Sequence, residues 1–144
     1  ESHSHGMISQ MPDLTRTVAN VTGPAAMEMA GIRHDDLDLT MIYDSFSYTT
    51  LVTLESLGFC GPGEGPDFVA GQRTAPGGDF PLNTSGGGLS YTHSGMYGVF
   101  LILEAVRQLR GECGERQLND PKIALMNGTG GSLSSTGSVV LGVD

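Results

Sequence analysis

The sequence predicts a single domain with a mixed α/β fold. Its 144 residues lie within the usual size of one domain, and the 38% that are hydrophobic can form a core. Hydrophobic residues recur at helical spacing in some segments and form short continuous runs in others, a pattern typical of helices that cover a sheet. The 22 glycines lie between these segments and indicate many tight turns.

The N-terminal part predicts two helices and then a strand. A short helix is expected over residues 13–21, with Asp13 as its N-cap, and a second one begins at Gly23 and Pro24 and ends at Gly31. Residues 37–43 are apolar and branched enough for a buried strand.

A helix and a long loop follow this strand. Apolar residues recur at helical spacing over residues 46–57, with Asp44 or Ser45 as the cap and Gly58 as the end. Residues 60–84 are rich in Gly and Pro and predict a loop of about 25 residues, a length typical of lids, binding loops and interfaces.

The C-terminal part predicts one more helix and two strands. The helix begins at Ser94 or Gly95 and ends at Arg110. Strands are expected over residues 122–126 and 139–143, and all three strands should share one sheet on which this helix packs. Helical spacing predicts the buried face of the helix: Val99, Ile102, Leu103, Val106 and Leu109.

Composition and charge exclude several classes of protein. A net charge of −9 without a basic cluster argues against a nucleic-acid binder or a partner of anionic membranes. The longest apolar run, residues 99–103, is far shorter than the roughly 20 residues of a membrane helix, and the sequence shows no signal-peptide pattern. Cys60 and Cys113 form no disulfide framework, which favours a reduced, cytoplasmic setting.

Generic catalytic motifs are absent from the sequence. There is no G-x-S-x-G nucleophile elbow, no Walker loop and no G-x-G-x-x-G. His3 and His5 could bind a metal, but no third ligand lies nearby, so a solvated terminus is preferred and no metal site is predicted.

Three short polar segments remain as candidates for a functional site. They are Tyr-Asp-Ser-Phe at residues 43–46, the glycine-rich segment around His93 at residues 85–98, and Asn-Gly-Thr-Gly-Gly at residues 127–131. Each lies where a strand meets a helix or a loop, and unpaired backbone N–H groups at such junctions can bind a ligand.

In these segments the chain resembles the C-terminal half of the thiolase superfamily, most closely its lipid-transfer-protein (sterol-carrier-protein-x) type. That family carries Asn-Glu-Ala-Phe, Gly-His-Pro-x-Gly-x-x-Gly and Cys-x-Gly motifs in the same order as the three segments. The resemblance implies a thiolase-like C-terminal domain over residues 1–144, with a mixed sheet covered by helices. It also implies that the N-terminal half is absent, and the chain opens without an initiator methionine, as a fragment would.

The chain departs from the family at three motif positions. Tyr43 stands where the family has the Asn that orients a catalytic water, and Ser94 replaces the Pro after the histidine. Asn127 replaces the catalytic Cys and cannot deprotonate a substrate, while Cys60 and Cys113 fall outside the motifs. These departures argue against ordinary Claisen thiolysis and leave retro-aldol cleavage, which needs a base and an oxyanion site but no acyl-accepting Cys.

The candidate catalytic residues are His93, Tyr43 and Asn127. A helix N-terminus favours a neutral His93 that donates to a thioester oxyanion; the alternative is a histidine that satisfies a turn. A helix N-terminus could likewise lower the pKa of Tyr43 and make it an acid or base; the alternative is a core tyrosine. Asn127 could donate to an enolate oxygen or form a turn. The three side-chain tips are expected within about 10 Å, around one cavity.

The candidate substrate-binding residues are Gly87, Gly88, Tyr91 and Gly130. The glycines allow a ligand to approach the backbone closely, or simply form tight bends. Tyr91 could line the pocket or pack on the glycine loop. Asp44 is interpreted as a helix cap rather than a catalyst.

The resemblance implies half of a thiolase-like acyltransferase that makes or breaks a carbon–carbon bond in an acyl-CoA thioester, with retro-aldol cleavage of lipid or steroid side chains as one form. The alternative is a non-catalytic thiolase-like binding or scaffold protein. Coenzyme A enters as the substrate thioester, and no further cofactor is implied. Expected partners are the N-terminal thiolase half, a second copy and a small OB-fold, zinc-ribbon protein. The chain alone should be inactive and should expose an apolar face where it associates.

Overall fold

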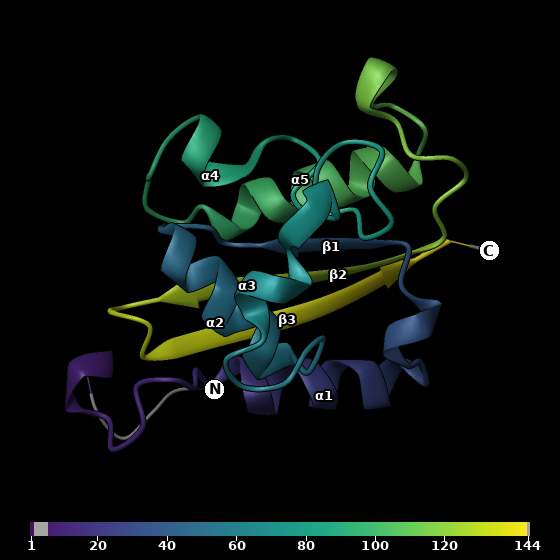
Figure 1. Ribbon diagram of the computed structural model, residues 1–144. Coiled ribbons are helices and arrows are strands. Elements are labelled where there is room, and N and C mark those ends of the chain that lie inside the picture. Colours follow the sequence, from purple (N-terminus) through teal and green to yellow (C-terminus); the bar gives the residue numbers. More distant parts are fainter. Residues whose placement is uncertain (2–5, 144) are drawn as a thin grey trace.

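Three strands form one mixed sheet, in the order β1–β2–β3 (Figure 1). The computed structural model describes residue 1 and residues 6–143. β1 (Leu39–Ile42) runs parallel to β2 (Ile123–Gly130), and β3 (Ser135–Gly142) returns antiparallel to β2. The prediction of one shared sheet is confirmed. The two C-terminal strands are longer than predicted, because the Gly/Ser/Thr segment continues their pairing up to a short hairpin turn.

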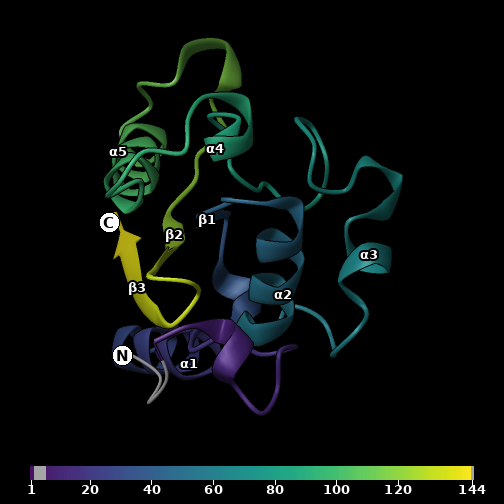
Figure 2. The same ribbon diagram turned by 90° about the vertical axis from the view of Figure 1, so that its left-hand side faces the viewer.

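Helices cover both faces of this sheet. α5 (Gly98–Leu109) packs on one face, and α1 (Ala19–Ala30) and α2 (Ser47–Leu57) pack on the other (Figures 1 and 2). The remaining helical segments are short: α3 (Gly65–Phe68), α4 (Gly87–Ser90) and 3₁₀ turns at Ile8–Gln10, His34–Asp36, Ala70–Gln72 and Gly114–Arg116. Within the described residues, no helix is long and apolar enough to span a membrane.

Two apolar clusters, one on each face, hold the helices to the sheet. Side chains alternate along a strand, so Met41 and Met126 face α5 and pack with its Leu101. Their neighbours Ile42 and Leu125 point the other way and pack against α1 and α2. This packing confirms that the helix predicted before Gly111 lies on the sheet.

The N-terminal region forms one helix, not the two that were predicted. Asp13 is not a helix cap, because the helix begins only at Ala19; its carboxylate forms a local turn, in which it accepts from the backbone and the hydroxyl of Thr15, at 2.9 and 2.6 Å. Gly23 and Pro24 lie inside α1 rather than at its start. Gly23 is a packing contact, since a side chain there would collide with Leu57 of α2.

The predicted buried face of α5 is wrong. Val99, Ile102 and Leu103 are 53%, 39% and 51% exposed, and Val106 and Leu109 are half-buried. The helix begins at Gly98, later than predicted, and turns a different set of residues inward: Leu101, Glu104, Ala105 and Gln108. An exposed apolar face therefore runs along α5, and two polar side chains take the buried positions.

The buried polar face of α5 is stabilised by an ion pair. Glu104 is 4% exposed and accepts two hydrogen bonds from the Arg116 guanidinium, at 2.9 and 3.0 Å. The Thr84 hydroxyl and the Gln108 amide also donate to it, at 2.9 and 3.3 Å. Burial alone would raise the pKa of Glu104, but these donors together hold it below its ordinary value. The network joins α5 to two loops.

Residues 60–84 are more ordered than the long loop that was predicted. They contain α3 and pack aromatic rings edge to face, with Phe80 against Phe59 and Phe68 at 4.9 and 5.0 Å. The end of this segment covers the free edge of β1. There the side chain of Asn83 accepts from the backbone N–H of Ile42 at 2.8 Å and donates to its carbonyl at 2.9 Å. The segment thus fixes the strand that leads into the first polar motif.

Candidate active site

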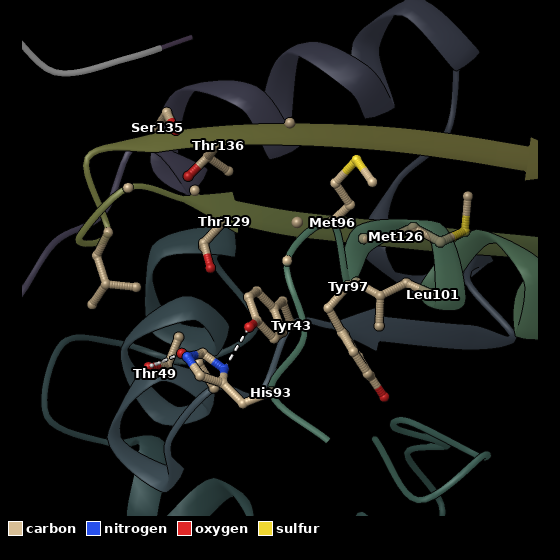
Figure 3. A pocket seen from close by; sticks show the side chains of 18 of the residues that line it. Tyr43, Thr49, His93, Met96, Tyr97, Leu101, Met126, Thr129, Ser135 and Thr136 are labelled. Atoms are coloured by element: carbon tan, nitrogen blue, oxygen red, sulfur yellow. Dashed lines mark hydrogen bonds between the residues drawn. The ribbon is translucent and has the colours of Figure 1, made fainter. Parts of the chain in front are cut away.

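A pocket of about 1260 Å³ opens at the end of the sheet where β2 and β3 form their hairpin (Figure 3). Segments that are far apart in the sequence line it: residues 43–49, from the end of β1 into α2, residues 93–99, which run into α5, and the hairpin itself. All three predicted polar segments therefore contribute to one hollow.

Tyr43 and His93 meet at this pocket. The Tyr43 hydroxyl and Nδ1 of His93 are hydrogen bonded at 2.6 Å, and their rings stack with centroids 5.7 Å apart (Figure 3). Tyr43 directly follows β1, and its backbone N–H donates to the carbonyl of Asn127 on β2, at 2.9 Å. The sheet thus fixes the tyrosine, and the tyrosine orients the histidine of the glycine-rich segment.

The protonation of this pair follows from the surroundings of Tyr43. Burial, with a smaller contribution from the neighbouring Asp44 charge, raises the pKa of Tyr43, so the expected lowering by a helix N-terminus is wrong. With its proton retained, the phenol donates to Nδ1, and this hydrogen bond selects the imidazole tautomer with its hydrogen on Nε2. Nε2 makes no hydrogen bond with the residues that the structure describes. It is therefore free to donate to a ligand.

Aromatic rings support the pair from both sides. Tyr97, which is 4% exposed, stacks on Tyr43 with a centroid distance of 5.0 Å and an interplanar angle of 20°. Phe46 lies against His93 at 5.9 Å. Burial raises the pKa of Tyr97 as well, so this ring acts as an uncharged support.

Asn127 is close in the sheet but points elsewhere. Its side chain is fully buried, and Nδ2 donates to the Ser138 hydroxyl at 2.7 Å. This bond turns the Asn127 side chain toward β3, and Asn127 does not line the pocket, although Met126 before it and Gly128 and Thr129 after it do. The structure thus brings Tyr43 and His93 together and leaves the Asn127 side chain outside the pocket.

The glycines near the second motif surround Asp44 rather than the pocket. Asp44 is 4% exposed and accepts from the backbone N–H groups of Gly88 and Leu89, at 2.6 and 3.2 Å. A side chain on Gly87 would collide with this carboxylate. Asp44 is therefore a cap, as interpreted from the sequence, but it caps the distant α4 instead of α2.

Only one of the four candidate substrate-binding residues lines the pocket. Gly130 lines the pocket, whereas Gly87, Gly88 and Tyr91 do not, and Tyr91 is 73% exposed. Thr129, between Gly128 and Gly130, also lines the pocket and was not singled out from the sequence. Its position inside the third motif was the one available signal.

No metal cluster is evident in the described part of the chain. Within residue 1 and residues 6–143, no three His, Cys, Asp or Glu side chains gather closely enough to hold a metal ion. His3 and His5 lie outside the described residues.

Comparison with known proteins gives the family. A model of the thiolase C-terminal domain-like family matches residues 1–143. The chain belongs to this family. Sterol carrier protein 2 of Bos taurus is 38% identical over 112 residues, which are 76% of this chain and 21% of that protein. The chain is thus a thiolase C-terminal domain of the sterol carrier protein type, as the resemblance implied.

Two other relatives are named as enzymes of different reactions. An acetyl-CoA acetyltransferase of Methanothermobacter thermautotrophicus is 37% identical over 122 residues, 83% of this chain and 32% of that protein. A steroid side-chain-cleaving aldolase of Thermomonospora curvata is 33% identical over 145 residues, 99% of this chain and 34% of that protein.

A solved structure has the same fold. The structure titled Ltp2-ChsH2(DUF35) aldolase superposes with a TM-score of 0.84 at 28% identity, over 99% of this chain and 37% of that chain. The thiolase domain described here thus spans between about a fifth and two fifths of the proteins it matches.

Proposed function

We propose that this thiolase domain forms part of the active site of an acyl-CoA carbon–carbon lyase, which cleaves β-hydroxyacyl thioesters by a retro-aldol reaction. The observation that carries the proposal is the Tyr43–His93 pair, joined at 2.6 Å in a pocket that neither cysteine lines. The names of two of the relatives, both aldolases, support it.

The pair can move a proton and stabilise an oxyanion together. The β-hydroxyl of the substrate gives its proton to the Tyr43 oxygen while the Tyr43 proton passes to Nδ1 of His93. The Cα–Cβ bond breaks, so that the β-carbon becomes a ketone and its electron pair forms the thioester enolate. The imidazolium donates from Nε2 to the enolate oxygen, and its charge strengthens this hydrogen bond. The proton that His93 took up then passes to Cα, directly or through water, which completes the shortened acyl-CoA and returns the pair to its starting state.

Claisen thiolysis fits the pocket less well. Cys60 packs on the opposite side of the sheet, among residues of α1 and α2. Cys113 is 3% exposed, and its thiol lies 3.7 Å from Glu104. Burial raises the pKa of both thiols, which disfavours the reactive thiolate.

The pocket suits a bulky apolar acyl group. Val99, Ile102 and Val139 also line it, and each is at least 39% exposed. A steroid side chain, as cleaved by one named relative, is our proposed substrate class. An apolar wall beside a polar pair is the usual composition of a site for such a ligand.

The same apolar side chains make the proposed contact with an N-terminal thiolase half. The face of α5 that carries Val99, Phe100, Ile102 and Leu103 is 39–53% exposed and continuous with the pocket. A partner there would cover the face and close the pocket. A small OB-fold, zinc-ribbon protein is a second proposed partner, supported by the two-component title of the matching structure.

Association through α5 can be measured on this chain alone. We expect it to self-associate in sedimentation velocity, because no partner covers the face. Leu103→Glu should shift it to monomer, whereas Val21→Glu, at a 52% exposed position of α1, should not. A wild-type chain that is strictly monomeric would contradict the expectation.

Replacing Tyr43 by Phe in the intact protein tests the proton path. The substitution removes the hydroxyl but keeps the stacking on Tyr97, so turnover should fall about 10²-fold or more while the melting temperature changes little. Lost stability with retained turnover would instead make Tyr43 a packing residue.

A non-catalytic binding role is the second candidate. It is favoured by the departure at Asn127, which stands at the catalytic Cys position and points away from the pocket. This role predicts that the intact protein binds acyl-CoA without cleaving it, and calorimetry alongside a product assay separates the two.

A further inference from the structure

We propose that Thr129 is a substrate-positioning residue, whose hydroxyl hydrogen-bonds the β-hydroxyl oxygen of the substrate; this rests on the lyase function proposed above. Thr129 lies in β2 and lines the pocket. Its hydroxyl has no hydrogen-bond partner among the described residues. In Figure 3 it points toward the side of the pocket where Tyr43 and His93 lie.

The strand presents this hydroxyl on a rigid and uncrowded support. Thr129 pairs in register with Thr136 of β3, so the hairpin fixes its backbone. Glycines flank it on both sides, and a side chain at Gly128 would meet only the backbone of Gly98 at 3.7 Å. The pocket can therefore extend around the end of β2 from Gly128 to Thr129.

Four other hydroxyls at the pocket are not available in this way. Those of Ser45 and Thr49 bond to each other at 3.0 Å. Those of Ser94 and Thr136 are buried without a partner among the described residues, and a water-sized group does not reach them. Thr129 combines a free hydroxyl with access to the pocket.

The proposed contact persists through the reaction. The substrate hydroxyl donates its hydrogen to Tyr43, and one of its lone pairs accepts from Thr129. When the carbon–carbon bond breaks, the same oxygen becomes the ketone carbonyl and can still accept that hydrogen bond. Thr129 would thus hold the oxygen in line with Tyr43 before and after cleavage.

The test compares binding of two thioesters by the intact protein: a β-hydroxyacyl-CoA and its analogue without the β-hydroxyl. In Thr129→Val, the Kd of the hydroxylated thioester should rise about 5- to 10-fold, the worth of one hydrogen bond, while the Kd of the deoxy analogue stays the same. Thr129→Ser should keep the wild-type preference. Valine is isosteric and favourable in a strand, so the melting temperature should be unchanged.

Thr53→Val is the matched control. Thr53 is a fully buried threonine of α2 whose hydroxyl has no partner among the described residues, and it does not line the pocket. This variant should keep both Kd values. An unchanged preference for the hydroxylated thioester in Thr129→Val would overturn the assignment of Thr129 alone. Failure of the wild-type protein to bind either thioester would overturn the proposed lyase function and the inference with it.

Discussion

Replacing His93 by Ala in the intact protein is expected to slow carbon–carbon cleavage about 10²–10³-fold, the usual cost of removing one oxyanion-hole donor. The reason is geometric: Nδ1 is engaged by Tyr43 at 2.6 Å, which leaves Nε2–H for the enolate oxygen. His93 is exposed and contributes little to the core, so the melting temperature should hold. The Kd for acyl-CoA should change less than kcat.

His34 offers a matched control for this experiment. Its Nε2 is hydrogen bonded to the Leu57 carbonyl at 2.8 Å, and its ring packs against Phe59, away from the pocket. His34→Ala should lower the melting temperature and leave kcat unchanged. Full activity in His93→Ala would remove the histidine from the mechanism.

Replacing Glu104 by Gln is expected to lower the free energy of unfolding by about 2–3 kcal/mol at neutral pH. The change removes a buried charge that accepts from Arg116, Thr84 and Gln108, and hydrogen bonds to charged groups are among the strongest in proteins. The loss should be smaller than for a fully buried ion pair, because the Arg116 side chain is 41% exposed and partly screened.

The effect of Glu104 should depend on pH with a definite sign. Its pKa is lowered in the folded state, so its stabilisation is complete above the ordinary carboxyl value of 4.5 and is lost as the pH falls through the lower folded value. Urea denaturation should therefore show a difference in the free energy of unfolding between wild type and Glu104→Gln at pH 7, and this difference should become smaller in acid. Asp120→Asn, which breaks an exposed ion pair with Lys122, should have almost the same free energy of unfolding as the wild type. A difference between wild type and Glu104→Gln that is equal at all pH values would contradict the proposed role of the Glu104 charge.

Local sequence patterns predicted correctly those elements whose position depends on neighbouring residues alone. The buried run before Tyr43 is β1, and Gly58 ends α2 with φ of +85°, as a C-terminal glycine should. The orientation of α5 could not be predicted this way. Helical spacing assigned its largest apolar residues to the core, but the network around Glu104 depends on Arg116, which lies in another segment.

The candidate site, too, could be predicted only in part. Junction position and family resemblance placed Tyr43 and His93 in one pocket, and the 2.6 Å contact agrees with that. The motif position of Asn127 did not reveal the direction of its side chain, which bonds to Ser138 of β3 and does not line the pocket. The role of Gly87 depended on Asp44, a partner from another segment that no local pattern identifies.

The most direct test of the central claim is a product assay with the intact protein and a steroid side-chain β-hydroxyacyl-CoA, without free coenzyme A. The retro-aldol account predicts equimolar release of a ketone and the shortened acyl-CoA, observed by mass spectrometry and abolished in the Tyr43→Phe, His93→Ala double variant. No cleavage of this substrate, together with coenzyme A-dependent cleavage of the matching 3-oxoacyl-CoA, would contradict it and establish thiolysis instead.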